Sequence, residues 1–274
     1  MPHPASAAPY QVRTHNASTQ SENRMHSDDV ARTFGFKGGL VPGVTVFAHM
    51  TQPVVARYDA AWLARGTADV SFSKPAYEGE LLSIHSADAA DGAHTLTCVN
   101  EQGVELAHMT AELPTVPVAT DVRGNIPPAP PLHERPTVTW DLMAINQPFP
   151  ALHWTPTRDE NLDWCADVRD ELPLYRHGDT PLLHPGLILR QANFVLRRRF
   201  IIPAWIHAAS RITFFEALRA GSPYEVRAIP EEKWNHKGHE FVRLFVAVRH
   251  EQRTVAEIFH TAIFRPRIRD TKTT

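Results

Sequence analysis

The stretch SENRMHSDDVARTFGFKGGLVPGVTVFAHM, residues 21–50, decides the fold of this chain. Its second half begins at Pro42-Gly43 and continues as an apolar run that is too hydrophobic for a surface helix and too short to cross a membrane. Proline is tolerated in the first turn of a helix, and a glycine there lets a ligand approach the free backbone N–H groups. We therefore predict a buried helix whose N-terminus can bind a carbonyl oxygen.

The polar half of the same stretch carries side chains suited to acid/base chemistry. Asn23, His26 and Asp28 place an amide, an imidazole and a carboxylate within six residues, and such groups move protons near neutral pH. His26 could instead be a surface histidine beside a helix that begins at 27–29, where Asp28 would act as a cap. Asn23 could simply order the loop through local hydrogen bonds.

The landmarks of this region recur 143 positions later in the chain. Pro185-Gly186 repeats Pro42-Gly43, and the other two repeated positions are Trp62 with Trp205 and Phe72 with Phe215. After each helical run, alternating segments predict antiparallel strands. They lie at 67–72, 81–85, 95–99 and 104–113 in the first half, and at 211–215, 224–229, 241–248 and 255–264 in the second.

The repeat predicts two copies of one helix wrapped by an antiparallel sheet, because a single copy would leave a sheet edge and a helix face uncovered. The proline-rich segment 114–136 predicts an extended linker. We expect a flexible arm at 1–20, a first copy at 21–113, the linker at 114–136, a second copy at 137–267 and a tail at 268–274.

The polar loop and the helix that follows it resemble the MaoC-like, R-specific enoyl-CoA hydratase group of hotdog-fold proteins. The matching positions are Asn23, His26, Asp28, Ala31, Gly35-Phe36 and Gly43. In that group the motif is Asp-x-Asn-Pro-x-His-x-Asp, whose first Asp and whose His form the hydration dyad, and a later His-Gly supplies a glycine amide to the thioester carbonyl. The resemblance implies an α+β double hotdog, with two tandem helices each wrapped by an antiparallel sheet.

Carried over to this sequence, the resemblance makes His26 the catalytic histidine, Asn23 the asparagine and Asp28 the trailing aspartate. It makes Gly43 the glycine whose amide binds the carbonyl. The sequence departs from the motif at Ser21, where the dyad aspartate would stand. It also has Arg24 for the proline and Pro42 for the histidine before the glycine.

The second copy matches the motif at two positions that the first copy lacks: Asp170 falls on the dyad aspartate, and His184 on the histidine before Gly186. It departs from the motif at Tyr175, which stands where the catalytic histidine would be. The spacing between Tyr175 and Pro185 is shorter than that between His26 and Pro42, so an ordinary turn is the alternative interpretation for residues 170–175.

The resemblance implies a hydro-lyase that adds water to, or removes it from, an enoyl or 3-hydroxyacyl thioester, carried by coenzyme A or an acyl carrier protein, without a cofactor or a metal. Three alternatives stay open: an acyl-thioester hydrolase, a degenerate hotdog protein that only binds acyl thioesters, and chemistry on a non-thioester carbonyl compound. A homodimer is compatible with each of them.

Composition indicates which binding partners and which cellular compartment to expect. The formal net charge is −2 with 43% hydrophobic residues, so neither nucleic acid nor a membrane is an expected partner. The two cysteines are far apart and form no CxxC, which indicates neither a zinc site nor a disulfide framework, and we expect a reducing cytoplasm. Residues 1–20 lack the apolar core of a secretory signal.

Overall fold

The helices and strands recur in the same order in the two halves of the chain. The computed structural model describes residues 8–89 and 92–267. The first copy contains β1 (Tyr10–Arg13), α1 (Asp28–Thr33), α2 (Gly43–Tyr58), α3 (Ala60–Arg65), β2 (Thr67–Phe72), β3 (Leu81–Asp88), β4 (His94–Asn100) and β5 (Glu105–Glu112). The second contains β6 (Leu152–Trp154), α4 (Arg158–Asp167), α5 (Pro185–Arg199), β7 (Ile206–Phe214), β8 (Tyr224–His236), β9 (His239–His250) and β10 (Arg253–Arg265). Short 3-10 turns lie at Arg24–His26 (η1), Val122–Asn125 (η2) and Pro173–Tyr175 (η3).

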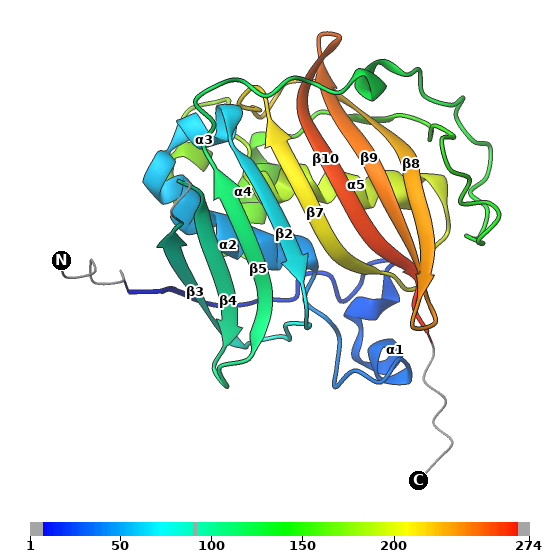
Figure 1. The fold of residues 1–274 in the computed structure, drawn as a ribbon, viewed down its shortest axis with the longest axis horizontal. Coiled ribbons are helices and arrows are strands. Elements are labelled where there is room, and N and C mark those ends of the chain that lie inside the picture. Colours follow the sequence, from blue (N-terminus) through cyan, green and yellow to red (C-terminus); the bar gives the residue numbers. More distant parts are fainter. Residues whose placement is uncertain (1–7, 90–91, 268–274) are drawn as a thin grey trace.

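All of these strands join one sheet, and the long helices lie behind it in Figure 1. In the described part of the chain the strand order is β1-β3-β4-β5-β2-β7-β10-β9-β8-β6. Each strand has a counterpart in the other copy: β1 with β6, β3 with β8, β4 with β9, β5 with β10 and β2 with β7. The counterparts follow one another in the same order when the sheet is read from either edge. The prediction of an α+β double hotdog is therefore confirmed.

The seam between the copies is the antiparallel pair of β2 and β7. Ala68 pairs with Ile212, and Asp69 pairs with Arg211. Shifting both members of either pair by the 143-residue repeat gives the other pair, so the copies are related by a two-fold axis between these residues. The repeat found in the sequence is thus also the symmetry of the sheet.

The two central helices owe their position to apolar side chains and one small residue. The apolar residues predicted for the first helix are buried in α2: Val44, Val46, Phe47, Met50, Val54 and Val55. Helices α2 and α5 contact each other. A Cβ atom on Gly186 would lie 2.9 Å from the Cβ of Ala48, so the close approach of the helices requires glycine at this position.

The strands of the second copy run further than the sequence predicts. The expected strand at 224–229 stops before Pro230, because proline lacks the N–H that a central strand needs. In the structure β8 continues to His236, and the register between β8 and β9 shifts between Pro230 and Glu232. A bulge at the proline therefore lets the strand continue.

Two segments outside the predicted copies are part of the packed structure. The segment expected as a flexible arm contains β1, which pairs with β3 and buries Val12, so this part of the expectation is corrected. The linker residues 121–125 contact three strands. The Asp121 N–H donates to Glu257 of β10, Arg123 pairs with Glu231 of β8, and Arg249 of β9 donates to Gly124 O. Residues 1–7 and the expected tail at 268–274 lie outside the described residues.

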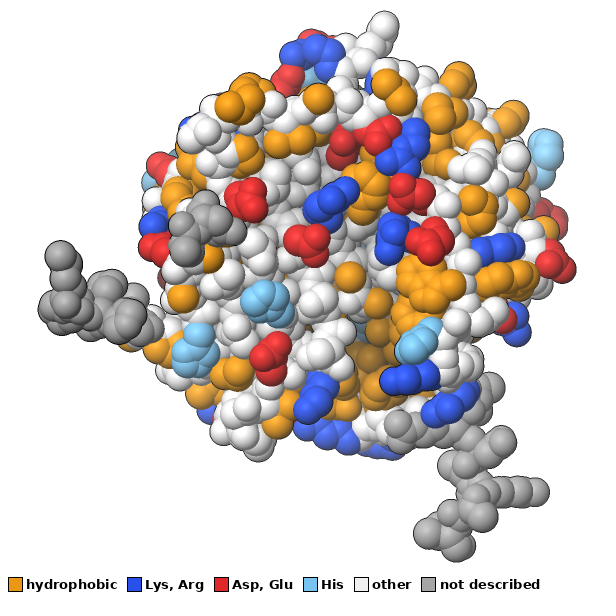
Figure 2. All heavy atoms as spheres, viewed as in Figure 1, with side chains coloured by type: hydrophobic (Ala, Val, Ile, Leu, Met, Phe, Trp, Pro, Cys, Tyr) orange, Lys and Arg blue, Asp and Glu red, His pale blue; other side chains and the backbone are white. Residues whose placement is uncertain are grey.

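The outer face of the sheet is charged, whereas the inner face is apolar. Figure 2 shows positive and negative side chains interspersed over the upper part of this outer face. Ion pairs among the exposed and half-buried side chains include Arg123–Asp121 before β6 and Arg243–Glu232, which joins β9 to β8. The core lies between the opposite face and the helices.

Two of the buried histidines, His49 and His260, have a strongly lowered pKa. His49 on α2 is 1% exposed and His260 on β10 is 0% exposed. Burial lowers the pKa of each imidazole to about 3, because a charged ring would lose its hydration. Both rings are therefore neutral over the physiological range of pH.

Replacing Ile212 by alanine should lower the free energy of unfolding by about 2–5 kcal/mol, because its side chain is 0% exposed at the seam and its truncation leaves a cavity. Urea unfolding followed by circular dichroism measures this loss. The control is Asp69→Ala, an exposed position on the same seam, where we expect a change within about 0.5 kcal/mol. Equal losses in the two variants would contradict the assigned role of the seam.

Acidification should destabilise the fold through His49 and His260. An unfolded histidine titrates near pH 6.5, so below that pH the unfolded chain binds protons that the folded chain rejects. Their stabilisation is complete above pH 6.5 and decreases as the pH falls towards the folded pKa of about 3. Between pH 7 and pH 5 the loss is about 2 kcal/mol for each histidine.

Urea unfolding at the two pH values tests this prediction. The variant His49→Leu should lose about 2 kcal/mol less than the unmodified chain between pH 7 and pH 5. The variant His108→Gln, at an exposed position of β5, should keep the full pH dependence. An unchanged pH dependence in His49→Leu would show that this ring is not excluded from protonation.

Candidate functional site

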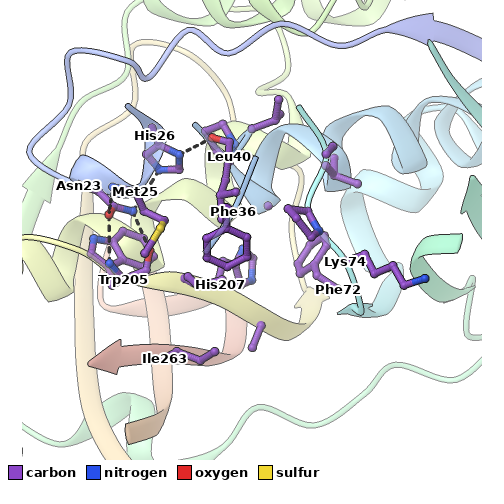
Figure 3. Close-up of a pocket in the computed structure, with 18 of the residues that line it drawn as sticks. Asn23, Met25, His26, Phe36, Leu40, Phe72, Lys74, Trp205, His207 and Ile263 are labelled. Carbon is purple, nitrogen blue, oxygen red and sulfur yellow. Dashed lines mark hydrogen bonds between the residues drawn. The ribbon is translucent and has the colours of Figure 1, made fainter. Parts of the chain in front are cut away.

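A cavity of about 230 Å³ lies at the N-terminus of α2, where the two copies of the sheet separate. The β2–β7 ladder ends at the pair Ser71–Ala209. Beyond it, the residues after β2 and the first residues of β7 line the cavity (Figure 3). Its lining is mainly apolar and comes from both copies, with Met25, Phe36, Leu40, Val46, Phe72, Trp205 and Ile263 among the lining residues.

The N-terminus of α2 is open to this cavity. Pro42 is the N-cap residue and provides no side-chain hydrogen bond, and within the described residues no acceptor meets the Gly43 N–H. A Cβ atom on Gly43 would lie 2.8 Å from His207 Nδ1, so only glycine fits between the helix and that ring. The partial positive charge of a helix N-terminus favours an anionic or carbonyl oxygen here.

His26 lies at the cavity wall in one defined tautomer. Asn23 Oδ1 accepts from the backbone N–H groups of Trp205 and Met25, so its Nδ2 is the atom that faces the ring. Nδ2 donates to His26 Nε2 at 3.1 Å, and His26 Nδ1 therefore carries the proton and donates to Leu40 O at 2.7 Å. Both ring nitrogens have a partner.

Burial is also the main influence on the charge of His26. It lowers the pKa of the ring, and the hydrogen bond to the Leu40 carbonyl opposes this shift only in part. The neutral imidazole is thus the resting form, with its only lone pair at Nε2. The second Asn23 hydrogen goes to Trp205 O at 2.9 Å, so Asn23 connects the loop of the first copy to the second copy.

The other polar residues predicted near His26 brace the loop instead of reaching the ring. Asp28 accepts from the Gly39 N–H at 2.8 Å and pairs with Arg32 at 2.9 Å. Ser21 Oγ donates to Asn23 O at 3.2 Å. Among the described residues that line the cavity there is neither an aspartate nor a glutamate.

In the second copy, the corresponding helix N-terminus is filled by the protein itself. His184 Nδ1 accepts from the Gly186 N–H at 3.0 Å and from Trp164 Nε1 at 3.1 Å. His184 Nε2 therefore carries the proton and donates to Asp170 at 3.2 Å. Tyr175 packs against the imidazole with ring centroids 4.7 Å apart.

The structure therefore brings together the four residues predicted in the second copy, but not at the open cavity. Asp170 is 2% exposed and His184 and Tyr175 are 0% exposed. Burial raises the pKa of Tyr175 well above its usual value. Asp170 contacts His184 and does not reach His26, so the two half-motifs stay separate.

Asn193 and His207 are cavity residues of the second copy that the sequence analysis did not predict. Asn193 on α5 lines the cavity, and its Oδ1 is buried without a hydrogen-bond partner. His207 on β7 lines the cavity beside Gly43. The only sequence signal for His207 is its position two residues after the repeated Trp205. That position does not indicate which face of β7 the side chain occupies.

In residues 8–89 and 92–267 no three His, Cys, Asp or Glu side chains come close enough together to hold a metal ion. Over the same residues, no helix is long and apolar enough to span a membrane.

The sequence matches no family model and no curated protein. Its structure is similar to that of a candidate MaoC-domain dehydratase from Chloroflexus aurantiacus J-10-fl, with a TM-score of 0.67 at 13% identity over 95% of this chain and 94% of that one. A double-hotdog protein of Mycobacterium tuberculosis gives a TM-score of 0.58 at 14% identity over 94% and 96% of the two chains.

A candidate oleoyl thioesterase from Lactobacillus plantarum gives a TM-score of 0.52 at 9% identity, and the match covers 96% of this chain and 98% of that one. The same fold thus occurs in proteins described as dehydratases and as thioesterases. This chain has the double hotdog fold that these structures share.

Proposed function

We propose that this chain is a hydro-lyase that adds water to, or removes it from, an α,β-unsaturated acyl thioester or a related carbonyl compound. The observation that carries the proposal is the open N-terminus of α2, whose Gly43 N–H faces an apolar cavity that also contains a neutral imidazole. An apolar acyl chain and a polarised carbonyl fit such a space.

The Gly43 N–H would polarise the carbonyl of the bound substrate. Addition of water to the double bond places negative charge on the carbonyl oxygen as an enolate forms. A backbone N–H at a helix N-terminus stabilises that charge without having to reorganise. Lys74, which is exposed and also lines the cavity, carries a positive charge suited to the phosphate groups of an acyl carrier.

His26 would move the proton. In the hydration direction, the water oxygen bonds to Cβ, one proton of the water passes to Nε2 and the electrons of the double bond move to the carbonyl oxygen. The imidazolium then returns a proton to Cα, so the ring ends neutral. This transfer requires the hydrogen bond from Asn23 to Nε2 to open.

The lining of the cavity bears on the two alternatives. A hydrolase that uses a carboxylate lacks support, since no described lining residue carries one. A protein that binds an acyl thioester without turnover is the second candidate, because both nitrogens of His26 are engaged.

Purified protein should hydrate enoyl thioesters or dehydrate 3-hydroxyacyl thioesters, measured through the absorbance of the conjugated enoyl group. His26→Ala should lower kcat by about 10²–10⁴-fold, the range that general acid/base catalysis contributes. His85→Ala, an exposed position of β3, is the matched control and should leave the rate unchanged.

Each alternative has its own outcome in the same panel. Release of free thiol without loss of the enoyl group would identify a hydrolase. Thermal stabilisation by the thioester without any turnover would identify a binding protein. The hydro-lyase proposal fails if no water is added or lost and His26→Ala binds the thioester unchanged.

A further inference from the structure

Three polar side chains of the second copy form a buried line that ends at the cavity. His207 Nε2 lies 2.8 Å from Ser210 Oγ, and Ser210 Oγ lies 3.0 Å from His260 Nδ1. All three side chains are buried, with exposures of 6%, 3% and 0%. We call this line the His207–Ser210–His260 relay.

A β-bulge places the relay on the inner face of the sheet. Thr261 pairs with Ala209 and Ala262 pairs with His207, so Ala208 has no partner on β10. Without this extra residue, the alternation that turns Ile212 and Ser210 inwards would turn His207 outwards. The bulge therefore directs the imidazole towards Gly43.

The cavity end of the relay has an unused polar atom. His207 Nδ1 is buried without a hydrogen-bond partner and lies beside the Gly43 backbone. A buried nitrogen without a partner costs free energy. The relay is absent from the first copy: Ala64 and Thr67 stand 143 residues before His207 and Ser210, and Thr67 pairs with Glu112 as Ser210 pairs with His260. The repeat alone does not account for it.

The His207 imidazole is neutral, so it can donate a hydrogen bond but does not act as a cation. Burial lowers the pKa of His207 well below its usual value, and the nearby His260 lowers it further, whereas a hydrogen bond with the Ala209 backbone opposes the shift in part. A neutral ring has one N–H, and its hydrogen-bond partners, Ser210 among them, decide which nitrogen carries it. If His260 Nδ1 donates to Ser210 and the hydroxyl donates to His207 Nε2, the remaining proton of His207 is on Nδ1.

We propose that His207 is the second donor of the oxyanion hole: its Nδ1–H and the Gly43 N–H bind the same carbonyl oxygen. This inference rests on the proposed function and adds a catalytic residue to it. No proton is transferred at His207, since a neutral imidazole N–H polarises a carbonyl by hydrogen bonding alone. Ser210 and His260 are positioning residues that hold the tautomer.

Substitutions at His207 test the donor directly on a thioester that the unmodified chain turns over. His207→Phe keeps a ring between Phe72 and His260 but removes the N–H, and should lower kcat about 10²–10³-fold, the loss typical of one missing oxyanion-hole donor. His207→Asn keeps an amide near the position of Nδ1 and should recover at least tenfold of that loss. Circular dichroism verifies that both variants fold.

Ser210→Ala tests the relay with little change in volume. It should lower kcat about 10–100-fold, as expected when the partner that orients a functional group is lost, and leave KM within about twofold because packing is retained. Ser71→Ala, at an exposed position of β2, is the matched control. A packing role alone for Ser210 would not produce the selective loss of kcat.

NMR of the chain labelled with ¹⁵N-histidine gives a readout besides activity. His207 should remain neutral at pH 6, with its proton on Nδ1, and a butanoyl thioester of N-acetylcysteamine should shift that N–H resonance. Ser210→Ala should change the tautomer of His207. A proton fixed on Nε2 in the presence of this thioester would overturn the proposal.

The kinetic outcomes separate the two proposals. Turnover by the unmodified chain with a kcat for His207→Phe within twofold of it would overturn the donor role and leave the hydro-lyase proposal standing. Absence of turnover with every enoyl and hydroxyacyl thioester would overturn both.

Discussion

The register between β2 and β7 is the constraint on which the rest of this structure depends. Five residue pairs join the two copies, and the two-fold axis between the copies passes between the pairs Ala68–Ile212 and Asp69–Arg211. Because the ladder ends at Ser71–Ala209, the strands beyond it leave space for the cavity under the N-terminus of α2. A slip of one residue would turn the inward side chains of β7 to the charged face.

The N-termini of α2 and α5 have the same backbone arrangement but different roles. At α5 the Gly186 N–H is capped by His184, which Asp170 and Trp164 hold in place. At α2 the Pro42 ring cannot act in this way, and the Gly43 N–H stays available. In the first copy the position of His184 is occupied by Val41, whose side chain accepts no hydrogen bond, and this difference makes one terminus structural and the other accessible.

Much of the fold follows from local patterns and the repeat. The apolar run after Pro42 predicted α2, alternation predicted the strands, and the 143-residue offset predicted the pairing of two copies. The patterns did not predict β1, because the four residues of 10–13 gain their place only by pairing with β3. The end of β8 was missed for a similar reason, since the bulge at Pro230 depends on β9.

The site was less predictable than the fold, because it depends on contacts across the seam. The sequence indicated His26, Asn23 and Gly43, which the cavity brings together. It placed Asp28 near them, but that carboxylate binds Gly39 and Arg32 instead. His207 escaped prediction because the unpaired Ala208 changes the face on which it lies, and no local pattern reveals a bulge formed against a distant strand.

Joining the copies in one polypeptide has a consequence for how this protein can change. In a dimer of identical chains, every substitution would appear in both cavities at once. Here His207 stands where the other copy has Ala64, and His184 stands where it has Val41. Because the two copies are encoded separately within one chain, each can mutate independently. The interior of one copy can therefore be filled by side chains that stabilise the fold, while the other copy keeps a cavity whose lining can change.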